Sequence, residues 1–442
     1  MRKSIVIILA ALMVCSSLLM GCTAAQTDTA ATNAVATEAT AAAEEATAAP
    51  TESAEPVEIH YAYWASPMDE FYAQCKAEFE AAHPNVTIVL EPTAWNEYWT
   101  KLETAATGGS VADVFHMNGV NIKKYADGGV LLPLDSYVTS GGLDLSKFPQ
   151  AMNDMYHFNG AQYGIPMDYD TVGLWYNKTL FDAANISYPT DDWTWEDLTN
   201  AAAAITALGN DTYGIAAGFQ DQQGIYNTVF AEDGWFVQNG TNGDEFGFNE
   251  AGTRAGIQCW VDLMAAGYSP SEASLEENEG YLQFMAGKIG MIFSGDWMVS
   301  YYNSADSTVA GKCDVAKLPL MENGKRASVI HGKANCISAA TAHPDEAWAW
   351  VQYLAGEQSN QRLGEMGIAI PANTDYSALF FAAYPDYNMG IYSDAAMNYS
   401  YSYPSSLDRA DWADIVRTEL QKAFKLEATV DEACDSIMAQ LG

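Results

Sequence analysis

Residues 59–64 read IHYAYW, and they open the series of segments that decides the fold. A short run this rich in aromatic residues is typical of a strand. The next predicted element is a helix over 68–82, where apolar residues recur near helical spacing until the sequence HPN at 83–85 ends it. The alternation then continues with strands at 86–90 and 113–117 and helices at 95–106 and 122–126.

This β-α-β-α-β order predicts an α/β fold in which the strands are parallel and the crossovers right-handed. Parallel sheets place ligands at the carboxyl ends of their strands. Trp64 and Asn118 lie at two such ends, so we expect both to face a ligand. The 386 residues from 57 to 442 exceed one small domain, which predicts two lobes.

The charge of the chain excludes whole classes of partner. Its 57 acidic and 20 basic residues give a formal net charge of −37. Nucleic acids and anionic lipid headgroups need Lys and Arg to neutralise phosphate, so neither is predicted as a partner. Much of this acidity is expected on solvated surface.

The first 22 residues resemble a bacterial lipoprotein signal. Arg2 and Lys3 precede an apolar run from Ile5 to Leu19, which is too short for a convincing membrane span, and the segment ends in Gly21-Cys22. The alternative is an ordinary secretory peptide that is cut elsewhere. The resemblance implies that residues 1–21 are removed and that lipidated Cys22 anchors the protein to the extracytoplasmic face of the cell membrane, at a Gram-positive cell surface.

A tether is predicted between this anchor and the lobes. Residues 22–56 are almost entirely Ala, Thr, Glu and Ser, with no aromatic and no basic residue. Such a segment buries too little apolar area to offset the entropy of ordering it. We therefore expect a disordered, acidic spacer.

Cysteine and acidic patterns predict no metal site and no cofactor. The five cysteines after Cys22 have long spacings without a zinc pattern, and their pairing stays open. Cys336 lies in an apolar run and is predicted to be a buried thiol. Asp191-Asp192 and Glu276-Glu277 lack calcium-loop spacing and are interpreted as solvated loops. The other cysteines are Cys75, Cys259, Cys313 and Cys434.

An ordered set of segments resembles the sugar-type extracellular solute-binding proteins of ABC importers, the group that contains maltose-binding protein. These segments are FEAAHPNVTIVLEP (79–92), GGSVADVFHMN (108–118), YADGGVLLPLDSYV (125–138), YGIPMDYDTVGLWYNKTLFDAANI (163–186), TWEDL (194–198), GKIGMIFSGDWM (287–298) and HPDEAWAWVQYLAGEQSNQRLGEMGIAIPAN (343–373). The resemblance covers nearly all of 57–442. It implies two α/β lobes, a hinge, a ligand cleft between the lobes and delivery to a membrane permease.

The resemblance also implies lobe boundaries. The first lobe is expected to hold 57–166 and about 319–371, with crossings near Pro166 and near Leu318-Pro319. The second lobe is expected to hold about 170–316 and 372–442. We expect a monomer.

A sugar offers apolar faces and a ring of hydroxyls. Aromatic rings cover the faces, and carboxylates, amides and Arg bond the hydroxyls. The chain has 12 Trp and 25 Tyr, although a large α/β protein also uses Trp in its core. On the resemblance and these chemical grounds, we predict ligand contacts for Trp64, Asn118, Asp168, Asp170, Trp235, Trp297, His331 and Arg409.

Several of these residues have an alternative role. Asp168 and Asp170 are also suited to hinge hydrogen bonds or helix capping, and His331 to a hinge or surface position. Arg409 has a salt bridge to Asp408 or Asp411 as its alternative. Trp95 and Glu97 match a region that touches longer sugars. The sequence HMN at 116–118 replaces a Trp-containing segment of the maltose-type pattern, so a maltodextrin ligand is not predicted.

Two other functions were considered. A glycoside hydrolase needs two carboxylates about 5–10 Å apart, and Asp168 and Asp170 are available as such a pair. However, the chain lacks the eight βα units of a barrel glycosidase and the G-x-S-x-G, P-loop and H-E-x-x-H motifs, so no catalytic residue is predicted. A surface glycan receptor that is not coupled to transport is the remaining alternative.

Overall fold

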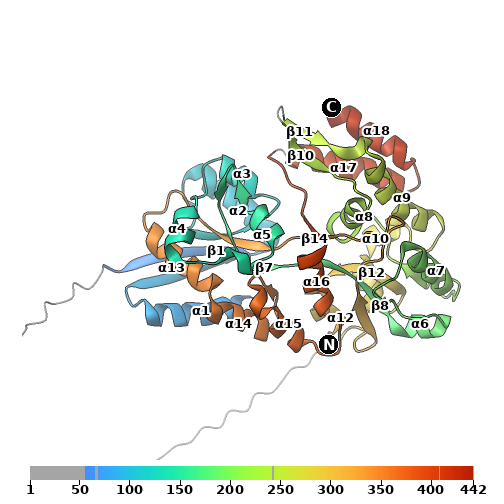
Figure 1. The fold of residues 1–442 in the computed structure, drawn as a ribbon, viewed down its shortest axis with the longest axis horizontal. Helices are drawn as coiled ribbons and strands as arrows, with labels where there is room; N and C mark the ends of the chain where they lie inside the picture. Colours follow the sequence, from blue (N-terminus) through green and yellow to red (C-terminus); the bar gives the residue numbers. More distant parts are fainter. Residues whose placement is uncertain (1–54, 65–67, 241–242, 408, 442) are drawn as a thin grey trace, which may run out of the picture. The chain divides into compact units, whose positions relative to one another are not determined.

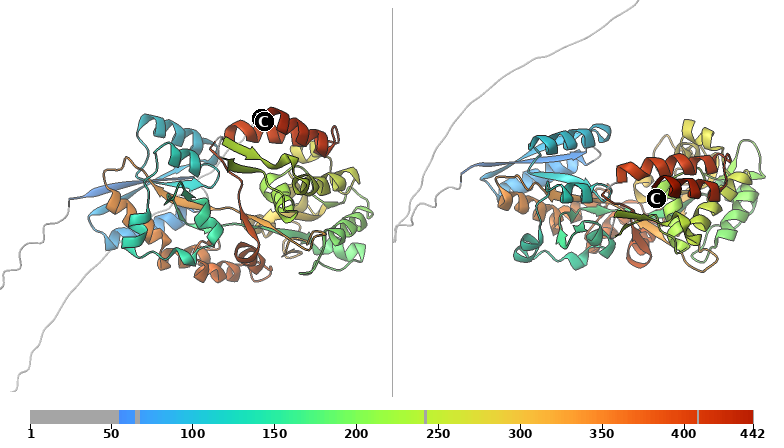
Figure 2. Two further views of the ribbon diagram at one scale, coloured as in Figure 1. Left: turned by 45° about the horizontal axis from the view of Figure 1, so that its top comes forward. Right: turned by 90° about the horizontal axis from the view of Figure 1, so that it is seen from above.

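The computed structural model describes residues 55–64, 68–240, 243–407 and 409–441. The predicted signal, Cys22 and the tether up to residue 54 lie outside this range. Residues 53–442 form one compact unit. Its two largest sheets, of five and four strands, are each surrounded by helices (Figures 1 and 2). We call the part around the five-stranded sheet the first lobe and the part around the four-stranded sheet the second lobe.

The first sheet has the strand order β2-β1-β3-β15-β6. β1 pairs in parallel with β2 and β3, as the sequence predicts, and β15 is antiparallel to both β3 and β6. Every residue of β3 is buried, which is typical of a strand that is covered on both faces. The strands are β1 (Val57–Trp64), β2 (Val86–Thr93), β3 (Val114–Asn118), β6 (Ile165–Pro166) and β15 (Lys333–Ile337).

The helices of the first lobe follow from apolar spacing and helix-ending residues. In α1 the buried Phe71, Cys75 and Phe79 recur every fourth residue and pack with α13 and α14 in one apolar cluster. α2 ends at Gly109, whose φ of 65° is the left-handed conformation that glycine adopts without strain. The helices are α1 (Asp69–Ala82), α2 (Trp95–Gly108), α3 (Ile122–Asp127), α4 (Asp135–Gly141), α5 (Gln150–Met155), α13 (Pro344–Ala355), α14 (Glu357–Glu365) and α15 (Ser377–Ala383).

The second sheet has the order β13-β8-β12-β9. β12 is parallel to β9, and β8 is antiparallel to both β12 and β13. A larger apolar cluster fills this lobe and reaches the first sheet. The elements are β8 (Val172–Asn177), β9 (Tyr213–Ile215), β12 (Ile289–Gly295), β13 (Cys313–Ala316), α6 (Lys178–Ala184), α7 (Trp195–Thr206), α8 (Tyr226–Ala231), α9 (Ala251–Ala265), α10 (Glu272–Glu277), α11 (Gly280–Met285), α12 (Val299–Tyr302), α17 (Arg409–Phe424) and α18 (Val430–Leu441).

Short strands connect the two sheets. Asp170 and His331 form an antiparallel bridge, in which the Asp170 N–H donates to the His331 carbonyl at 2.8 Å and the His331 N–H to the Asp170 carbonyl at 3.1 Å. Further strands add to this region, and Figure 1 shows β7 and β14 between the lobes. They are β7 (Asp168–Tyr169), paired with β16 (Ile370–Pro371), and β14 (Ser328–Ile330), paired in parallel with β17 (Ser400–Ser402).

Pairings along residues 318–330 bear on where the chain crosses between the lobes for the second time. Leu320 forms a bridge with Thr194 in the second lobe, and Lys325 pairs with Asp233 there. The chain enters the first sheet only at Lys333. Because these long-range pairings hold 318–330 on the second lobe, we propose a crossing at 331–333 in place of Leu318-Pro319.

Cys336 is fully buried, as predicted. All five cysteines of the described chain are free thiols. No helix among the described residues has the length and apolar character needed to cross a membrane.

Candidate functional site

Strand direction brings the predicted residues of the first lobe to one edge of its sheet. β1, β2, β3 and β6 run in the same direction, so Trp64, Asn118 and Asp168 all lie at or beside carboxyl ends. Lys333, at the amino end of antiparallel β15, is in register with Asn118. This is the edge at which α/β sheets bind ligands.

The second sheet also has an edge that carries predicted residues, at the carboxyl end of β12. The carboxyl end of β12 leads into Asp296 and Trp297, and Gly295 is in register with Val172 at the start of β8. Asp170 therefore lies at the same edge as Asp296. Because only a few residues separate Asp168 from Asp170 and His331 from Lys333, the edges of the two sheets adjoin at the crossing strands.

The two predicted carboxylates at the crossing have different partners. Asp168 is buried, accepts a hydrogen bond from the Lys333 N–H at 2.9 Å and forms an ion pair with the Lys333 ammonium group. Asp170 accepts a hydrogen bond from Gln222 Nε2 at 2.7 Å and lies 3.8 Å from His331 Nδ1. Asp168 thus makes bonds of the kind expected for its alternative role at the hinge. Asp170 instead fixes the side chain of Gln222, which belongs to the second lobe.

A third carboxylate, Asp296, lies beside them. Its side chain is 2% exposed, and burial, followed by the negative charge of Asp170, raises its pKa well above the usual range. Within the part of the chain that the structure describes, its Oδ1 atom has no hydrogen-bond partner.

A pocket of 440 Å³, which we call the acidic pocket, opens at this edge of the second sheet. The loop after β9, α10, the start of α11, the end of β12 and α17 all contribute to it. Its polar lining consists of Gln220, Asp221, Gln223, Glu272, Glu276, Glu279, Arg417 and Gln421, and its aromatic lining of Phe219, Trp260, Tyr281 and Phe293.

Hydrogen bonds hold the polar lining in place. Ser294 Oγ donates to Gln223 Oε1 at 3.0 Å, and Tyr403 Oη donates to Asp221 Oδ2 at 2.8 Å. Glu272 is 5% exposed, accepts from the Phe219 N–H at 2.9 Å, and has its pKa raised by burial. Side chains fixed before a ligand arrives lose less entropy on binding.

The predicted residues of the first lobe form an aromatic wall made of Trp64, Trp95 and Trp99. The ring of Trp64 lies 5.2 Å from that of Trp95 and 5.8 Å from that of Trp99, between ring centres. Trp95 is 48% exposed, so it offers a free face. Asn118 is buried, and its side-chain oxygen accepts from the backbone and side chain of Asn121, which fixes the turn into α3.

Trp297 is half-buried and directly precedes Met298, which lines the acidic pocket. Arg409 is held by the second lobe. It lies 3.8 Å from Asp221 and contacts the rings of Tyr403 and Trp412. Its ion-pair partner is therefore Asp221 and not Asp411, while Asp408 lies outside the described residues.

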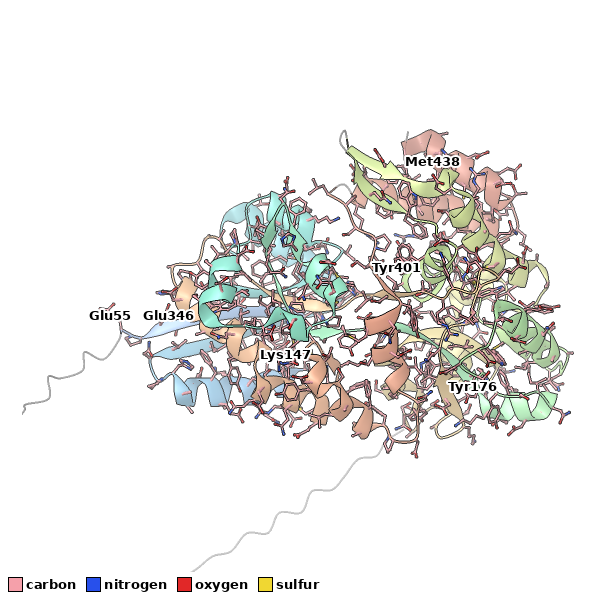
Figure 3. All side chains as sticks on the ribbon, viewed as in Figure 1. Glu55, Lys147, Tyr176, Glu346, Tyr401 and Met438 are labelled. Carbon is pink, nitrogen blue, oxygen red and sulfur yellow. The ribbon has the colours of Figure 1, made fainter. Side chains whose placement is uncertain are left out.

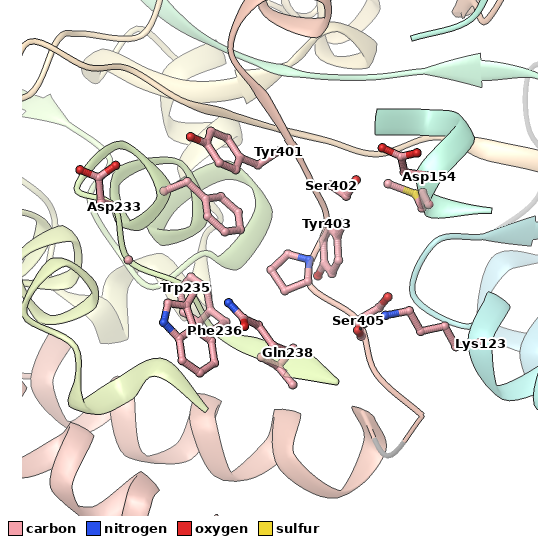
Figure 4. Close-up of a pocket in the computed structure, with 15 residues that line it drawn as sticks. Lys123, Asp154, Asp233, Trp235, Phe236, Gln238, Tyr401, Ser402, Tyr403 and Ser405 are labelled. Atoms are coloured by element: carbon pink, nitrogen blue, oxygen red, sulfur yellow. Dashed lines mark hydrogen bonds between the residues drawn. The ribbon is translucent and has the colours of Figure 1, made fainter. Parts of the chain in front are cut away.

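Trp235 does not join the other predicted residues. It lines a separate pocket of 490 Å³, which we call the Trp235 pocket, together with residues of α3, α5 and the segment 401–405 (Figure 4). The two pockets share no lining residue. Trp297 lines neither pocket, so the structure does not bring Trp235 and Trp297 to one pocket.

None of the eight predicted residues is among those that line the acidic pocket, although the sequence held two kinds of signal for its lining. Glu272 and Glu276, and likewise Arg417 and Gln421, are four residues apart and so share a helix face. The polar run 220–223 lies in the segment that follows strand β9. The interpretation of Glu276 as part of a solvated loop was wrong, because it lies in α10, lines the pocket and pairs with Lys425 at 2.9 Å.

The model of one protein family, described as bacterial extracellular solute-binding protein, matches residues 27–361. The chain belongs to this family. The match covers both sheet edges and the loop of the acidic pocket up to α14. It therefore agrees with a site built for binding a solute at the junction of two lobes.

Two relatives from Bacillus subtilis are named for the sugars that they bind. The chain is 25% identical to the maltodextrin-binding protein MdxE over 312 residues, which cover 69% of this chain and 71% of the relative. It is 26% identical to the galactooligosaccharide-binding protein over 305 residues, covering 67% and 68%.

Solved structures show the same fold. An ABC substrate-binding protein from Listeria monocytogenes, in complex with cycloalternan, superposes with a TM-score of 0.76 at 24% identity and covers 87% of this chain and 98% of its own. The sugar-binding protein MalE from Xanthomonas citri also reaches 0.76, at 22% identity, with 87% and 96% covered. The fold is thus the two-lobed α/β fold predicted from the sequence.

Proposed function

We propose that this protein captures a carbohydrate between its two lobes and delivers it to the permease of an ABC importer. The observation that carries the proposal is the acidic pocket of the second lobe, where carboxylates, amides, an arginine and aromatic rings converge, next to Gln222, which bonds Asp170 at the crossing. Relatives named for maltodextrin and galactooligosaccharide binding support the ligand class.

The chemistry of the two edges suits a sugar. Carboxylates accept hydrogen bonds from hydroxyl groups, and amides both donate and accept. Asp221 and Gln223 supply these groups in the acidic pocket, and Asp170 bonds the intervening Gln222, whereas the aromatic wall supplies flat faces on the first lobe.

Capture proceeds without catalysis in this proposal. Asp168, one of the two carboxylates that a hydrolase would need, is occupied by Lys333 and by a backbone N–H. The ligand instead favours a closed arrangement of the lobes, which requires tighter binding to the closed form than to the open one. Closure then presents a surface that the permease recognises.

The N-terminal segment places the protein at the membrane. We propose that Cys22 carries the lipid anchor and that residues 22–56 act as the tether, with the protein monomeric on the extracytoplasmic face. Incorporation of radiolabelled palmitate tests the anchor. The wild-type protein should carry the label and Cys22→Ala should not, and equal labelling of both would contradict an anchor at Cys22.

Thermal unfolding of residues 53–442 tests the function. Maltotriose, galactobiose and arabinotriose are compared with amino acids, a peptide mixture and calcium chloride. A ligand that binds only the folded state raises the melting temperature by mass action. A rise with saccharide alone, with the saccharide recovered intact, is expected. A rise only with peptides or calcium, or cleavage of the saccharide, would contradict the proposal.

A further inference from the structure

The Trp235 pocket is lined by both lobes and lies apart from the acidic pocket. Lys123 of α3 and Asp154 of α5 contribute from the first lobe, and Trp235 and Gln238 from the second (Figure 4). The segment 401–405 forms the remaining lining. A volume of 490 Å³ is in the range of small-molecule sites and exceeds what a single sugar ring fills.

Aromatic faces in this pocket are fixed in position. The ring of Tyr401 lies parallel to that of Phe230, with ring centres 4.8 Å apart and planes at 7°, yet Tyr401 remains 44% exposed. Trp235 is half-buried, and its backbone N–H and carbonyl both bond Thr253 Oγ1. Figure 3 shows Tyr401 in the region between the lobes. Rigid, exposed rings are suited to stacking against the C–H face of a sugar.

The polar groups of the pocket favour a neutral, hydroxyl-rich ligand. Lys123 Nζ donates to the Ser405 carbonyl at 2.8 Å, which leaves two of its three N–H donors for a ligand. Asp154 accepts from Gln150, and Asp233 is neutralised by Lys325 at 2.6 Å. One ammonium group and one open carboxylate therefore face the pocket, with no excess charge that would select an ion.

The two pockets meet at one side chain. The ring of Tyr403 lines the Trp235 pocket, whereas its hydroxyl donates to Asp221 of the acidic pocket. The same ring lies 5.1 Å from that of His331 at the crossing. A change at Tyr403 would therefore disturb both pockets, so a test of one pocket has to use other residues.

We propose that the Trp235 pocket is a second carbohydrate-binding site that takes a neutral mono- or disaccharide unit independently of the acidic pocket. Trp235 and Tyr401 stack on the sugar, and Lys123, Asp154 and Gln238 bond its hydroxyls. The ligand class rests on the proposed function, whereas the existence of a separate site rests on this pocket alone.

Isothermal titration calorimetry of residues 53–442 tests the second site. Maltotriose, galactobiose and arabinotriose are titrated into the wild type and into the variants Trp235→Ala, Tyr401→Ala and Asp170→Asn. Trp193→Ala is the matched control, because Trp193 is also half-buried in the second lobe but lines neither pocket. Circular dichroism melting of every variant verifies folding, and the exposed Tyr401 provides a variant that leaves the core untouched.

The expected result is two binding events per chain for one saccharide. Trp235→Ala and Tyr401→Ala weaken one event at least tenfold, or about 1.4 kcal/mol, and leave the other unchanged, while Asp170→Asn does the reverse. A single event, lost in Asp170→Asn and kept in both aromatic variants, would overturn the second site and leave the proposed function standing. No binding of any saccharide to the wild type would instead overturn the proposed function.

Discussion

The two sheet edges that meet at the crossing strands offer opposite chemistry. The edge of the first sheet carries the aromatic wall, with Trp95 exposed, and the edge of the second carries carboxylates and amides around the acidic pocket. A sugar also has two kinds of surface, because its C–H faces are apolar and its rim is made of hydroxyls. We infer that the first lobe supplies mainly stacking faces and the second lobe most of the hydrogen-bonding groups, together with the aromatic rings of its pocket, so a ligand gains both kinds of contact in full only when the lobes come together.

The largest expected effect on this division of roles comes from Asp170. Asp170→Asn removes the charge that accepts from Gln222 and that we place against the ligand. A hydrogen bond to a charged group contributes about 1.5–3 kcal/mol, so saccharide affinity should fall about 10- to 100-fold in calorimetry.

A control for Asp170 is available at the surface. Asp306→Asn neutralises an exposed carboxylate that lines neither pocket. It should leave the affinity of the acidic pocket unchanged. An equal loss in both variants would mean that overall charge, and not the contact at Asp170, governs binding.

The next largest effect is expected at Trp297. Trp297→Ala removes a half-buried ring beside the acidic pocket and should weaken saccharide binding at least tenfold, or about 1.4 kcal/mol, without unfolding the protein. Tryptophan fluorescence titration measures the affinity, and the melting temperature reports folding. Unchanged affinity would remove Trp297 from the site.

A smaller effect, dependent on ligand length, is expected at the aromatic wall. Trp95→Ala removes the exposed ring while Trp64 and Trp99 remain. We expect a loss of about 1 kcal/mol, near fivefold, for a trisaccharide and less for a disaccharide. Calorimetry with maltotriose and maltose, or with another matched pair that binds, compares the two. Equal losses for both lengths would contradict an extended wall.

The smallest effect on binding, but a clear one on stability, is expected at Asp296. Its raised pKa means that the folded state keeps a proton that the unfolded chain releases above its ordinary pKa of about 3.9. Stability is therefore lost as pH rises from that value toward the folded-state pKa. Asp296→Asn removes this loss, so its advantage in melting temperature over the wild type should grow from pH 5 to pH 8. An advantage that does not change with pH would contradict a protonated Asp296.

Much of the fold could be predicted because its signals are local. Apolar spacing and helix-ending residues placed α1 and α2, and the β-α-β-α-β order gave the parallel pairing of β1, β2 and β3. The position of the second crossing could not be predicted in this way. It depends on the pairing of Leu320 with Thr194, which are 126 positions apart by subtraction, and no local pattern records such a contact.

The residues of the candidate site likewise differ in whether local sequence signals predict their position. Trp64, Asn118 and Asp170 could be placed because strand ends converge once the topology is known. Glu272, Tyr281 and Arg417 come from separate helices whose approach is set by packing. Trp235 was predicted to contact the ligand, but the sequence alone does not show that its pocket is separate from the acidic pocket.

A crystal structure of residues 53–442, grown with the saccharide that raises the melting temperature most, tests the central claim most directly. The account predicts an intact sugar against Asp170, Asp221 and Trp297, with the lobes closed so that the aromatic wall covers one of its faces. Sugar found in the Trp235 pocket alone, or bound with the acidic pocket empty, would contradict it.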